Sequence, residues 1–212
     1  MSFIPGNEAR LAALAAAYDS DAEERNKRVM AWRDEIIDRW AATLEPGARI
    51  LELGAGTGQA AARLESQGFS VMALDLSPEN VARCRERGLS AAVADVGRIE
   101  DIADPAFQPP YDAAFAFNSL IHFPKGELDA ALTSIRTALS PGSPLMFTLW
   151  GGDSGEGIWE EDWTEPKRFF AYYDDAEAEA LEFTAFERTS LTILDNEDEL
   201  GLHSQIFELR AV

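Results

Sequence analysis

Residues 50–58 read ILELGAGTG, an apolar run that carries one carboxylate and then breaks into three glycines at alternate positions. The apolar part predicts a buried strand, and the glycines predict a tight loop that opens a helix. Because Gly54, Gly56 and Gly58 lack Cβ atoms, the chain can turn sharply and a ligand can approach the backbone amides at the helix N-terminus. The stretch therefore predicts a binding site for a nucleotide-like ligand.

Two residues of this segment bear on the kind of nucleotide. A dinucleotide fingerprint has its third Gly or Ala three positions after the second glycine, and that position is Gln59, while Gly58 comes one residue too early. Glu52 lies at the carboxyl end of the predicted strand, where its carboxylate would repel a pyrophosphate and could accept hydrogen bonds from a cationic ligand. The pattern disfavours an NAD(P)-dependent oxidoreductase, which is kept as an alternative.

This pairing of an acidic residue with a glycine-rich loop resembles the first motif of the class I S-adenosylmethionine-dependent methyltransferases. The resemblance implies that the ligand is S-adenosyl-L-methionine, a cationic sulfonium that becomes S-adenosyl-L-homocysteine when the methyl leaves. It also implies that this donor is bound by Glu52 and the loop residues Gly54, Ala55, Gly56 and Gly58.

Two later apolar runs also end in acidic residues. Asp75 follows Gly54 by 21 positions, and an acidic residue about 20 positions on, closing the second strand of a βαβ unit, is placed to bind both ribose hydroxyls. Leu76 beside it would then pack on the adenine. The resemblance implies that Asp95 accepts a hydrogen bond from the adenine amino group. It also implies that the backbone amide of Val96 reaches a ring nitrogen of the adenine. The alternative is that both carboxylates only end their strands.

Residues 111–124, YDAAFAFNSLIHFP, form an apolar strand that ends in a polar turn and resemble the family's fourth motif. The resemblance places Phe117, Asn118 and Ser119 beneath the methionine part of the donor. His122 follows closely and is the candidate general base, because an unperturbed histidine pKa of about 6.5 suits proton removal at neutral pH. Its alternative roles are packing on the ligand or capping the next helix.

The order of elements predicts the fold class. Strands and helices alternate between residues 46 and 150, which is typical of a parallel sheet. Two β-rich stretches, 187–194 and 203–210, are joined by the acidic turn 195–201 and predict a terminal hairpin. We expect one α/β domain with a Rossmann-like seven-stranded, mostly parallel sheet, helices on both faces and a C-terminal antiparallel hairpin, the first five strands being parallel.

Three regions are expected within this domain. Residues 1–45 have apolar positions at helical spacing and would form a helical lid, from which Tyr18 or Arg33 reaches the methionine part, or else a pair of surface-covering helices. Residues 46–150 would bind the donor. Residues 151–212 would supply a loop, a helix and the hairpin on the acceptor side.

The acceptor side is rich in aromatic residues. The glycine-rich stretch 151–157 predicts a mobile loop. Trp150 precedes it, and Trp159, Trp163 and Tyr172 follow it, near the carboxyl edge of the sheet where ligands bind in open α/β folds. These aromatic side chains would either enclose a small acceptor or cover the edge of the sheet.

Charge and composition restrict the partners. The 212 residues include 38 acidic and 18 basic ones, and residues 151–212 alone carry 17 acids and 4 bases, so a nucleic-acid acceptor is not expected. No apolar run is long enough for a bilayer and the first ten residues lack signal-peptide features. With Cys84 as the single cysteine, a reducing cytoplasm is the expected location, and the protein is expected to be a monomer or homodimer. Cys84 is interpreted as a packed helix residue.

The expected function is methyl transfer from S-adenosyl-L-methionine to a small molecule by in-line displacement, with oxygen favoured over nitrogen as the accepting atom. No Cys-x-x-Cys or His-x-x-x-His spacing occurs, so no metal is expected. The alternative from another class is a non-catalytic S-adenosylmethionine-binding scaffold.

Overall fold

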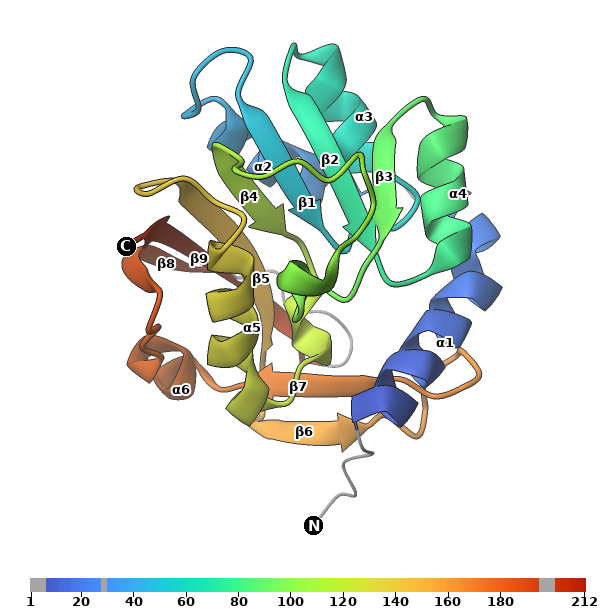
Figure 1. The fold of residues 1–212 in the computed structure, drawn as a ribbon. Helices are drawn as coiled ribbons and strands as arrows, with labels where there is room; N and C mark the ends of the chain where they lie inside the picture. Colours follow the sequence, from blue (N-terminus) through green and yellow to red (C-terminus); the bar gives the residue numbers. More distant parts are fainter. Residues whose placement is uncertain (1–6, 28–29, 195–200) are drawn as a thin grey trace.

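The predicted alternation of strands and helices produces the parallel core of the sheet. The computed structural model describes residues 7–27, 30–194 and 201–212. Five strands run parallel in the order β3-β2-β1-β4-β5 (Figure 1), namely β1 (Arg49–Leu53), β2 (Ser70–Asp75), β3 (Ser90–Val93), β4 (Ala113–Ala116) and β5 (Pro144–Gly151). Because the strand order reverses between β1 and β4, the carboxyl ends of these two strands border the crevice in which open α/β sheets bind ligands.

Each strand supplies apolar residues to both faces of the sheet, because successive side chains point in opposite directions. In β1, Leu51 and Leu53 belong to one core and Ile50 to the other. The first core lies against α5 (Leu128–Arg136), and the second lies against α2 (Ala31–Ala41), α3 (Gln59–Ser66) and α4 (Pro78–Glu86). The predicted α/β architecture with helices on both faces is therefore confirmed.

The prediction of seven strands is wrong in number, since the described residues form nine. The two additional strands are β6 (Gly155–Ile158) and β7 (Phe169–Tyr173), which pair antiparallel. β6 occupies part of the stretch 151–157, which was expected to be a mobile loop. Residues 155–158 form a strand because they pair with residues 169–172 of β7, a partner that local sequence does not reveal.

The position of β7 affects the crevice. β9 (His203–Ala211) pairs antiparallel with β5 along its whole length, whereas β4 pairs only with residues 145–147 of the opposite edge. β7 pairs in parallel with Trp150 and Gly151 at the end of β5. It therefore occupies the edge left free where β4 ends, and forms a roof above the residues that follow β4.

The C-terminal hairpin is confirmed. β8 (Phe186–Leu194) pairs antiparallel with β9, and residues 195–200 of the predicted turn lie outside the described residues. The short helix α6 (Asp175–Ala180) begins with a capping box formed by Asp174 and Glu177. Three short 3₁₀ segments complete the fold: η1 (Ile99–Asp101), η2 (Leu120–His122) and η3 (Lys125–Glu127).

The N-terminal helix α1 (Asn7–Lys27) lies below the carboxyl ends of β1, β2 and β3 (Figure 1). Near its start, the buried Arg10 side chain donates to the backbone oxygen of His122 at 2.8 Å and to the Glu127 carboxylate at 2.6 Å. Further along, the Asp19 carboxylate accepts from the backbone N–H of Glu79 at 3.1 Å, at the N-terminus of α4. In the described part of the chain, neither α1 nor any other helix has the length and apolarity needed to cross a bilayer.

Candidate functional site

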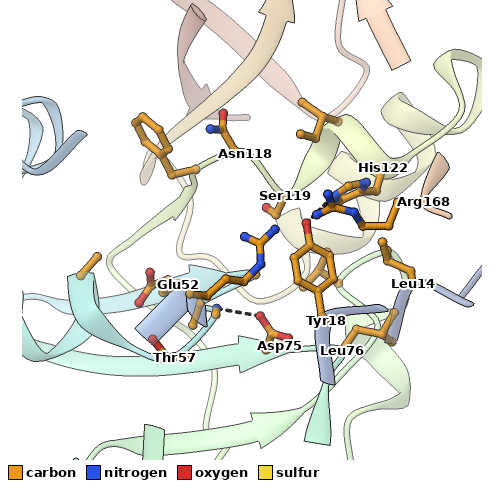
Figure 2. A pocket seen from close by; sticks show the side chains of 18 of the residues that line it. Leu14, Tyr18, Glu52, Thr57, Asp75, Leu76, Asn118, Ser119, His122 and Arg168 are labelled. Carbon is orange, nitrogen blue, oxygen red and sulfur yellow. Dashed lines mark hydrogen bonds between the residues drawn. The ribbon is translucent and has the colours of Figure 1, made fainter. Parts of the chain in front are cut away.

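A cavity of about 290 Å³ lies at the switch point between β1 and β4 and extends beneath α1 and β7 (Figure 2). Of the nineteen site residues predicted from the sequence, sixteen line it and three, Gly58, Trp159 and Tyr172, do not. The lining members are Tyr18, Arg33, Glu52, Gly54, Ala55, Gly56, Asp75, Leu76, Asp95, Val96, Phe117, Asn118, Ser119, His122, Trp150 and Trp163.

The glycine loop is fastened to the end of β2 by backbone hydrogen bonds. The N–H groups of Gly54 and Ala55 donate to the carbonyl of Leu74 at 2.8 and 2.9 Å. The N–H of Gly56 donates to a carboxylate oxygen of Asp75 at 2.7 Å. The loop and the strand-end acid therefore form one rigid unit at the cavity wall.

Asp75 has a structural role that the sequence did not indicate. Its other oxygen accepts from the backbone N–H of Ser77 at 2.9 Å and from the side-chain amide of Asn80 at 3.2 Å. Burial nevertheless raises the pKa of this carboxyl, although these donors and Gly56 act to lower it. The same side chain thus holds the loop in place and presents its charge to the cavity.

Replacing Gly54 by Ala is expected to destabilise the protein strongly. Gly54 has φ of 77°, and a Cβ atom there would lie 2.3 Å from the Cβ of Ser119, whose hydroxyl is held on the carbonyl of Leu53 at 2.7 Å. We expect a left-handed strain of about 1–2 kcal/mol plus roughly 1–3 kcal/mol for the overlap, measured by denaturant unfolding.

The matched control for this substitution is Gly68→Ala. Gly68 also has a positive φ, 96°, but a Cβ atom there would meet no other atom within 4 Å. It should therefore show the backbone strain alone. Equal losses of unfolding free energy in the two variants would contradict a role of Gly54 in allowing Ser119 to approach.

Glu52 is a buried acid beside the cavity with an incomplete set of partners. Its side chain is 5% exposed, and its Oε2 atom has no hydrogen-bond partner among the described residues. Burial raises its pKa to about 8; Arg33 opposes this rise and Asp75 adds to it. A buried carboxyl of this kind gains hydrogen bonds and a favourable charge if a cationic ligand occupies the cavity.

A further acidic residue, Asp95, lines the cavity together with apolar residues. Asp95 accepts from the backbone N–H of Gly97 at 2.9 Å through one oxygen. Leu76 and Val96 are two of the apolar residues that line the same cavity. This arrangement suits a flat ring that carries a hydrogen-bond donor.

The residues that follow β4 are held by a threonine that sequence reasoning missed. Asn118 adopts φ of 55°, its backbone N–H donates to the Thr148 hydroxyl at 2.8 Å, and that hydroxyl donates to the Asn118 side-chain oxygen at 2.9 Å. Thr148 is fully buried in β5. Its side chain fixes the turn that places Phe117, Asn118 and Ser119 against the cavity.

His122 is held between α1 and β7. Its Nδ1 atom lies 2.8 Å from the backbone oxygen of Phe169, and its Nε2 atom lies 2.5 Å from the Tyr18 hydroxyl. Burial, with Arg168 and Arg25 nearby, lowers its pKa to about 3. The expectation of a pKa near 6.5 is therefore wrong, because α1 and β7 bury the ring completely, and the imidazole is neutral at physiological pH.

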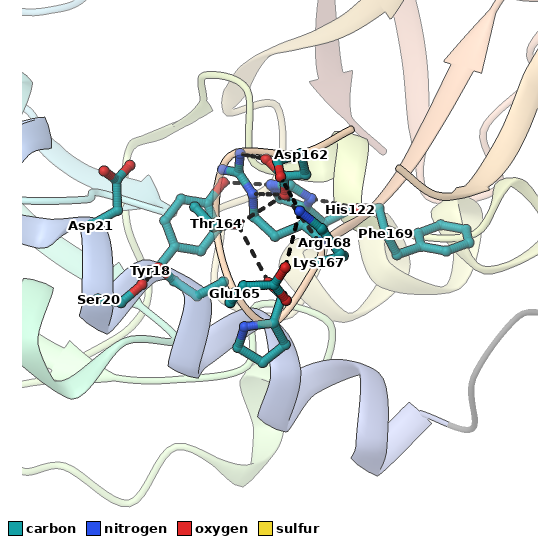
Figure 3. Close-up of polar contacts among 12 residues, drawn as sticks. Tyr18, Ser20, Asp21, His122, Asp162, Thr164, Glu165, Lys167, Arg168 and Phe169 are labelled. Carbon is teal, nitrogen blue, oxygen red and sulfur yellow. Dashed lines mark hydrogen bonds and ion pairs between the residues drawn. The ribbon is translucent and has the colours of Figure 1, made fainter. Parts of the chain in front are cut away.

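An ion pair that the sequence did not suggest stands beside this histidine (Figure 3). Arg168 donates from Nε and Nη2 to the two carboxylate oxygens of Asp162, both at 2.7 Å, and both side chains are buried. Burial acts to raise the pKa of Asp162, but the hydrogen bonds from Arg168 and Thr164 lower it to about 2. Nothing in the spacing of these residues distinguishes them from solvated charges.

Some aromatic residues of the acceptor side line the cavity, and others pack behind them. Trp150 and Phe170 line the cavity and stack with ring centroids 5.1 Å apart and planes at 10°. Trp159 packs on Phe170 at 5.7 Å, and Tyr172 packs on Trp150 at 6.1 Å, both outside the lining. Phe170 is therefore an aromatic wall residue in addition to the site residues predicted from the sequence.

Among the residues that the structure describes, no three His, Cys, Asp or Glu side chains come together as metal ligands. Cys84 is fully buried in α4, and burial, together with Glu52 and Asp75, raises the pKa of its thiol to about 12. The thiolate is therefore absent at neutral pH, in agreement with a packing role.

Comparisons with known proteins agree with this geometry. Residues 21–187 match the family model described as a methyltransferase domain. A ubiquinone biosynthesis O-methyltransferase of Xanthomonas campestris pv. campestris is 31% identical over 142 residues, which are 66% of this chain and 58% of that protein. The chain thus spans about three fifths of the length of this curated relative.

Two solved structures share the fold. One is the Burkholderia thailandensis 1,6-didemethyltoxoflavin-N1-methyltransferase with bound 1,6-didemethyltoxoflavin and S-adenosylhomocysteine, with a TM-score of 0.74, 21% identity, and coverage of 100% of this chain and 93% of that one. The other is the [4+2]-cyclase SpnF, with a TM-score of 0.62, 21% identity, and coverage of 84% and 80%.

Proposed function

Because this chain belongs to the S-adenosylmethionine-dependent methyltransferase family, we propose that it transfers a methyl group from S-adenosyl-L-methionine to a small-molecule acceptor, with oxygen favoured over nitrogen as the accepting atom. The observation that carries the proposal is a single cavity that joins the acidic strand ends to an aromatic chamber. Residues 46–150 bind the donor, residues 1–45 form the lid, and residues 151–212 form most of the acceptor side.

The residues of the donor side fit such a ligand. Glu52 has a buried oxygen without a hydrogen-bond partner and a raised pKa. A bound cation would supply a partner for this oxygen and would lower the pKa. We infer that Asp75 binds the ribose and that Asp95, Leu76 and Val96 bind the adenine, since all four line the cavity. The sulfonium supplies an activated methyl group, so no covalent enzyme intermediate is required.

The protein's contribution is then alignment and exclusion of water. The lid is fastened through Arg10 and Asp19, and β7 roofs the residues after β4, so the reacting groups are enclosed. Such alignment lowers a barrier by roughly 7–11 kcal/mol. No metal is part of the proposal.

The acceptor side favours a small molecule over a polyanion. The net charge of −20 on the whole chain repels nucleic acid, and the lining near Trp150, Trp163 and Phe170 is aromatic. The names of the relatives include both an O-methyltransferase and an N1-methyltransferase. A cytoplasmic location and a monomeric or dimeric state stay predictions.

Calorimetry tests the donor. S-adenosylmethionine and S-adenosylhomocysteine should bind one equivalent each, whereas NADH should not bind. Binding of NADH alone would overturn the proposal and favour the oxidoreductase alternative.

Turnover tests catalysis. The protein is incubated with S-adenosylmethionine and a panel of hydroxyaromatic, N-heteroaromatic, carboxylate and thiol compounds, and S-adenosylhomocysteine is quantified. Donor binding without any turnover would favour a non-methylating role, for which the [4+2]-cyclase SpnF shows that the fold is suitable.

A further inference from the structure

We propose that the acceptor is a planar aromatic compound that presents a hydroxyl or ring N–H to Tyr18, and that its proton leaves through the Tyr18 hydroxyl to Nε2 of His122. The proposal rests on the proposed methyl transfer and specifies the acceptor of the same cavity. It makes Tyr18 a catalytic residue and His122 the group that receives the proton through it.

The hydrogen bonds of His122 fix its tautomer. The backbone oxygen of Phe169 can only accept, so Nδ1, 2.8 Å away, carries the ring proton. In the neutral ring Nε2 is then an acceptor, and the Tyr18 hydroxyl 2.5 Å away must donate to it. The imidazole is thus held with its basic nitrogen directed at the phenol.

The Tyr18 hydroxyl consequently has one lone pair, and no proton, left for a ligand. Its single proton points to His122, and the Arg168 side chain donates a hydrogen bond to its oxygen. Tyr18, His122 and Arg168 all line the cavity, and Figure 2 shows the hydroxyl directed toward the other two. A ligand that binds here gains most if it donates a hydrogen bond.

Tyr18 and His122 together account for the bonds and the proton of the reaction. When S-adenosylmethionine supplies the methyl, a lone pair of the acceptor atom forms the new bond, the electrons of the broken S–C bond stay on sulfur, and the acceptor's proton must leave. Tyr18 takes this proton at its oxygen while its own proton moves to Nε2 of His122. A carboxylate or thiolate acceptor would have no use for such a relay.

The charges around His122 are compatible with this step. Arg25 and Tyr18 face the ring from α1, Arg168 and Asp162 face it from the segment before β7, and Arg10 binds its backbone oxygen. The cations and the burial keep the ring neutral in the ligand-free protein. During transfer, however, the positive charge of the donor disappears as the imidazolium forms, so the enclosed site gains no net charge.

The walls next to Tyr18 suit a flat ring. Trp150 and Phe170 form a parallel stack along the cavity, and Trp163, 56% exposed, lies at its edge with its ring 4.6 Å from the Arg168 guanidinium carbon. Aromatic ligands pack well on such surfaces. The combination of flat walls and a hydrogen-bond acceptor defines the substrate class.

Nitrogen-15 NMR of histidine-labelled protein tests the tautomer without turnover. The protonated Nδ1 and unprotonated Nε2 pattern should persist from pH 8 to pH 5, and the Nε2 shift should change in Tyr18→Phe. Tyr111→Phe is the matched control, because its hydroxyl accepts from Gln108 away from the cavity, at 3.1 Å. Protonation at Nε2, or titration of His122 near pH 6.5, would overturn the proposal.

A ligand pair tests the acceptor class. 4-Methylphenol, which keeps its proton at neutral pH, and 4-methylanisole, its methyl ether, are titrated into the complex with S-adenosylhomocysteine. The phenol should bind about tenfold more tightly, in keeping with one hydrogen bond, and Tyr18→Phe should remove this difference while Tyr111→Phe keeps it. An unchanged ratio in Tyr18→Phe, or binding of neither compound, would overturn the proposal, whereas the proposed function fails only if S-adenosylhomocysteine itself does not bind.

Discussion

Replacing Asp75 by Asn is expected to weaken the binding of S-adenosylmethionine by about 30- to 100-fold, as the loss of a charge-assisted hydrogen bond requires. The proposed ribose contact uses the negative charge of a carboxylate that is only 7% exposed, so solvent does not compensate for its loss. Asparagine keeps the shape of the side chain but presents one amide group where Asp75 presents an acceptor. Calorimetry with S-adenosylmethionine measures the change.

The same substitution should lower stability. Both Asp75 oxygens accept hydrogen bonds, from the N–H groups of Gly56 and Ser77. Whichever way the asparagine amide is turned, one of these donors faces an NH₂ group. We therefore expect thermal unfolding several degrees lower, so affinity must be measured well below the transition.

The control for Asp75→Asn is Asp101→Asn, an exposed acid whose only described ion pair is with Arg98 at the surface. It removes the same charge from a chain that already carries a large negative excess. Wild-type donor affinity in a folded Asp75→Asn protein would refute the ribose role, and an equal loss in both variants would indicate a general electrostatic effect.

The donor side could be predicted from the sequence because its residues are fixed by local rules. Parallel strands all end at the same edge of the sheet, so acids that follow apolar runs, such as Glu52, Asp75 and Asp95, must gather there. The glycines at alternate positions predict a tight turn directly, because glycine adopts backbone conformations that other residues avoid. For these residues, position along the chain is nearly equivalent to position in space.

The acceptor side could not be predicted in the same way. The pairing of Gly155–Ile158 with β7, and the burial of Arg168 against Asp162, depend on partners that no periodicity indicates. His122 was found by its place after β4, but its low pKa arises because α1 and β7 enclose the ring. Charge state is a property of the assembled environment, whereas residue type is read directly from the chain.

Glu52 leads to the second large expected effect, which is release of a proton when the donor binds. Because burial raises the pKa of Glu52 to about 8, most of the ligand-free protein carries a neutral Glu52 at pH 7. A cationic ligand favours the ionised form, so binding at pH 7 should release close to one proton and the donor affinity should increase with pH up to about 8. Calorimetry in two buffers of different ionisation enthalpy measures this release.

The sign of the stability effect follows from the same shift. Between the unfolded value of 4.5 and the folded value of about 8, the folded protein holds a proton on Glu52 that the unfolded chain has lost. Raising the pH through this window therefore destabilises the ligand-free protein, by up to about 1.4 kcal/mol per pH unit from this group. Glu52→Gln should remove that contribution and unfold at higher temperature than the wild type at pH 9.

The comparison between variants isolates Glu52 from other titrating groups, including Asp75, whose pKa is also raised. Glu65→Gln, at an exposed position of α3, is the matched control and should keep the wild-type dependence of stability on pH. Glu52→Gln should also abolish proton release and bind S-adenosylmethionine more weakly, with S-adenosylhomocysteine less affected because it lacks the sulfonium charge. Two results together would show that the ionisation of Glu52 does not respond to the charge of the donor. These are parallel profiles of stability against pH in wild type and Glu52→Gln, and no proton release on donor binding in either protein.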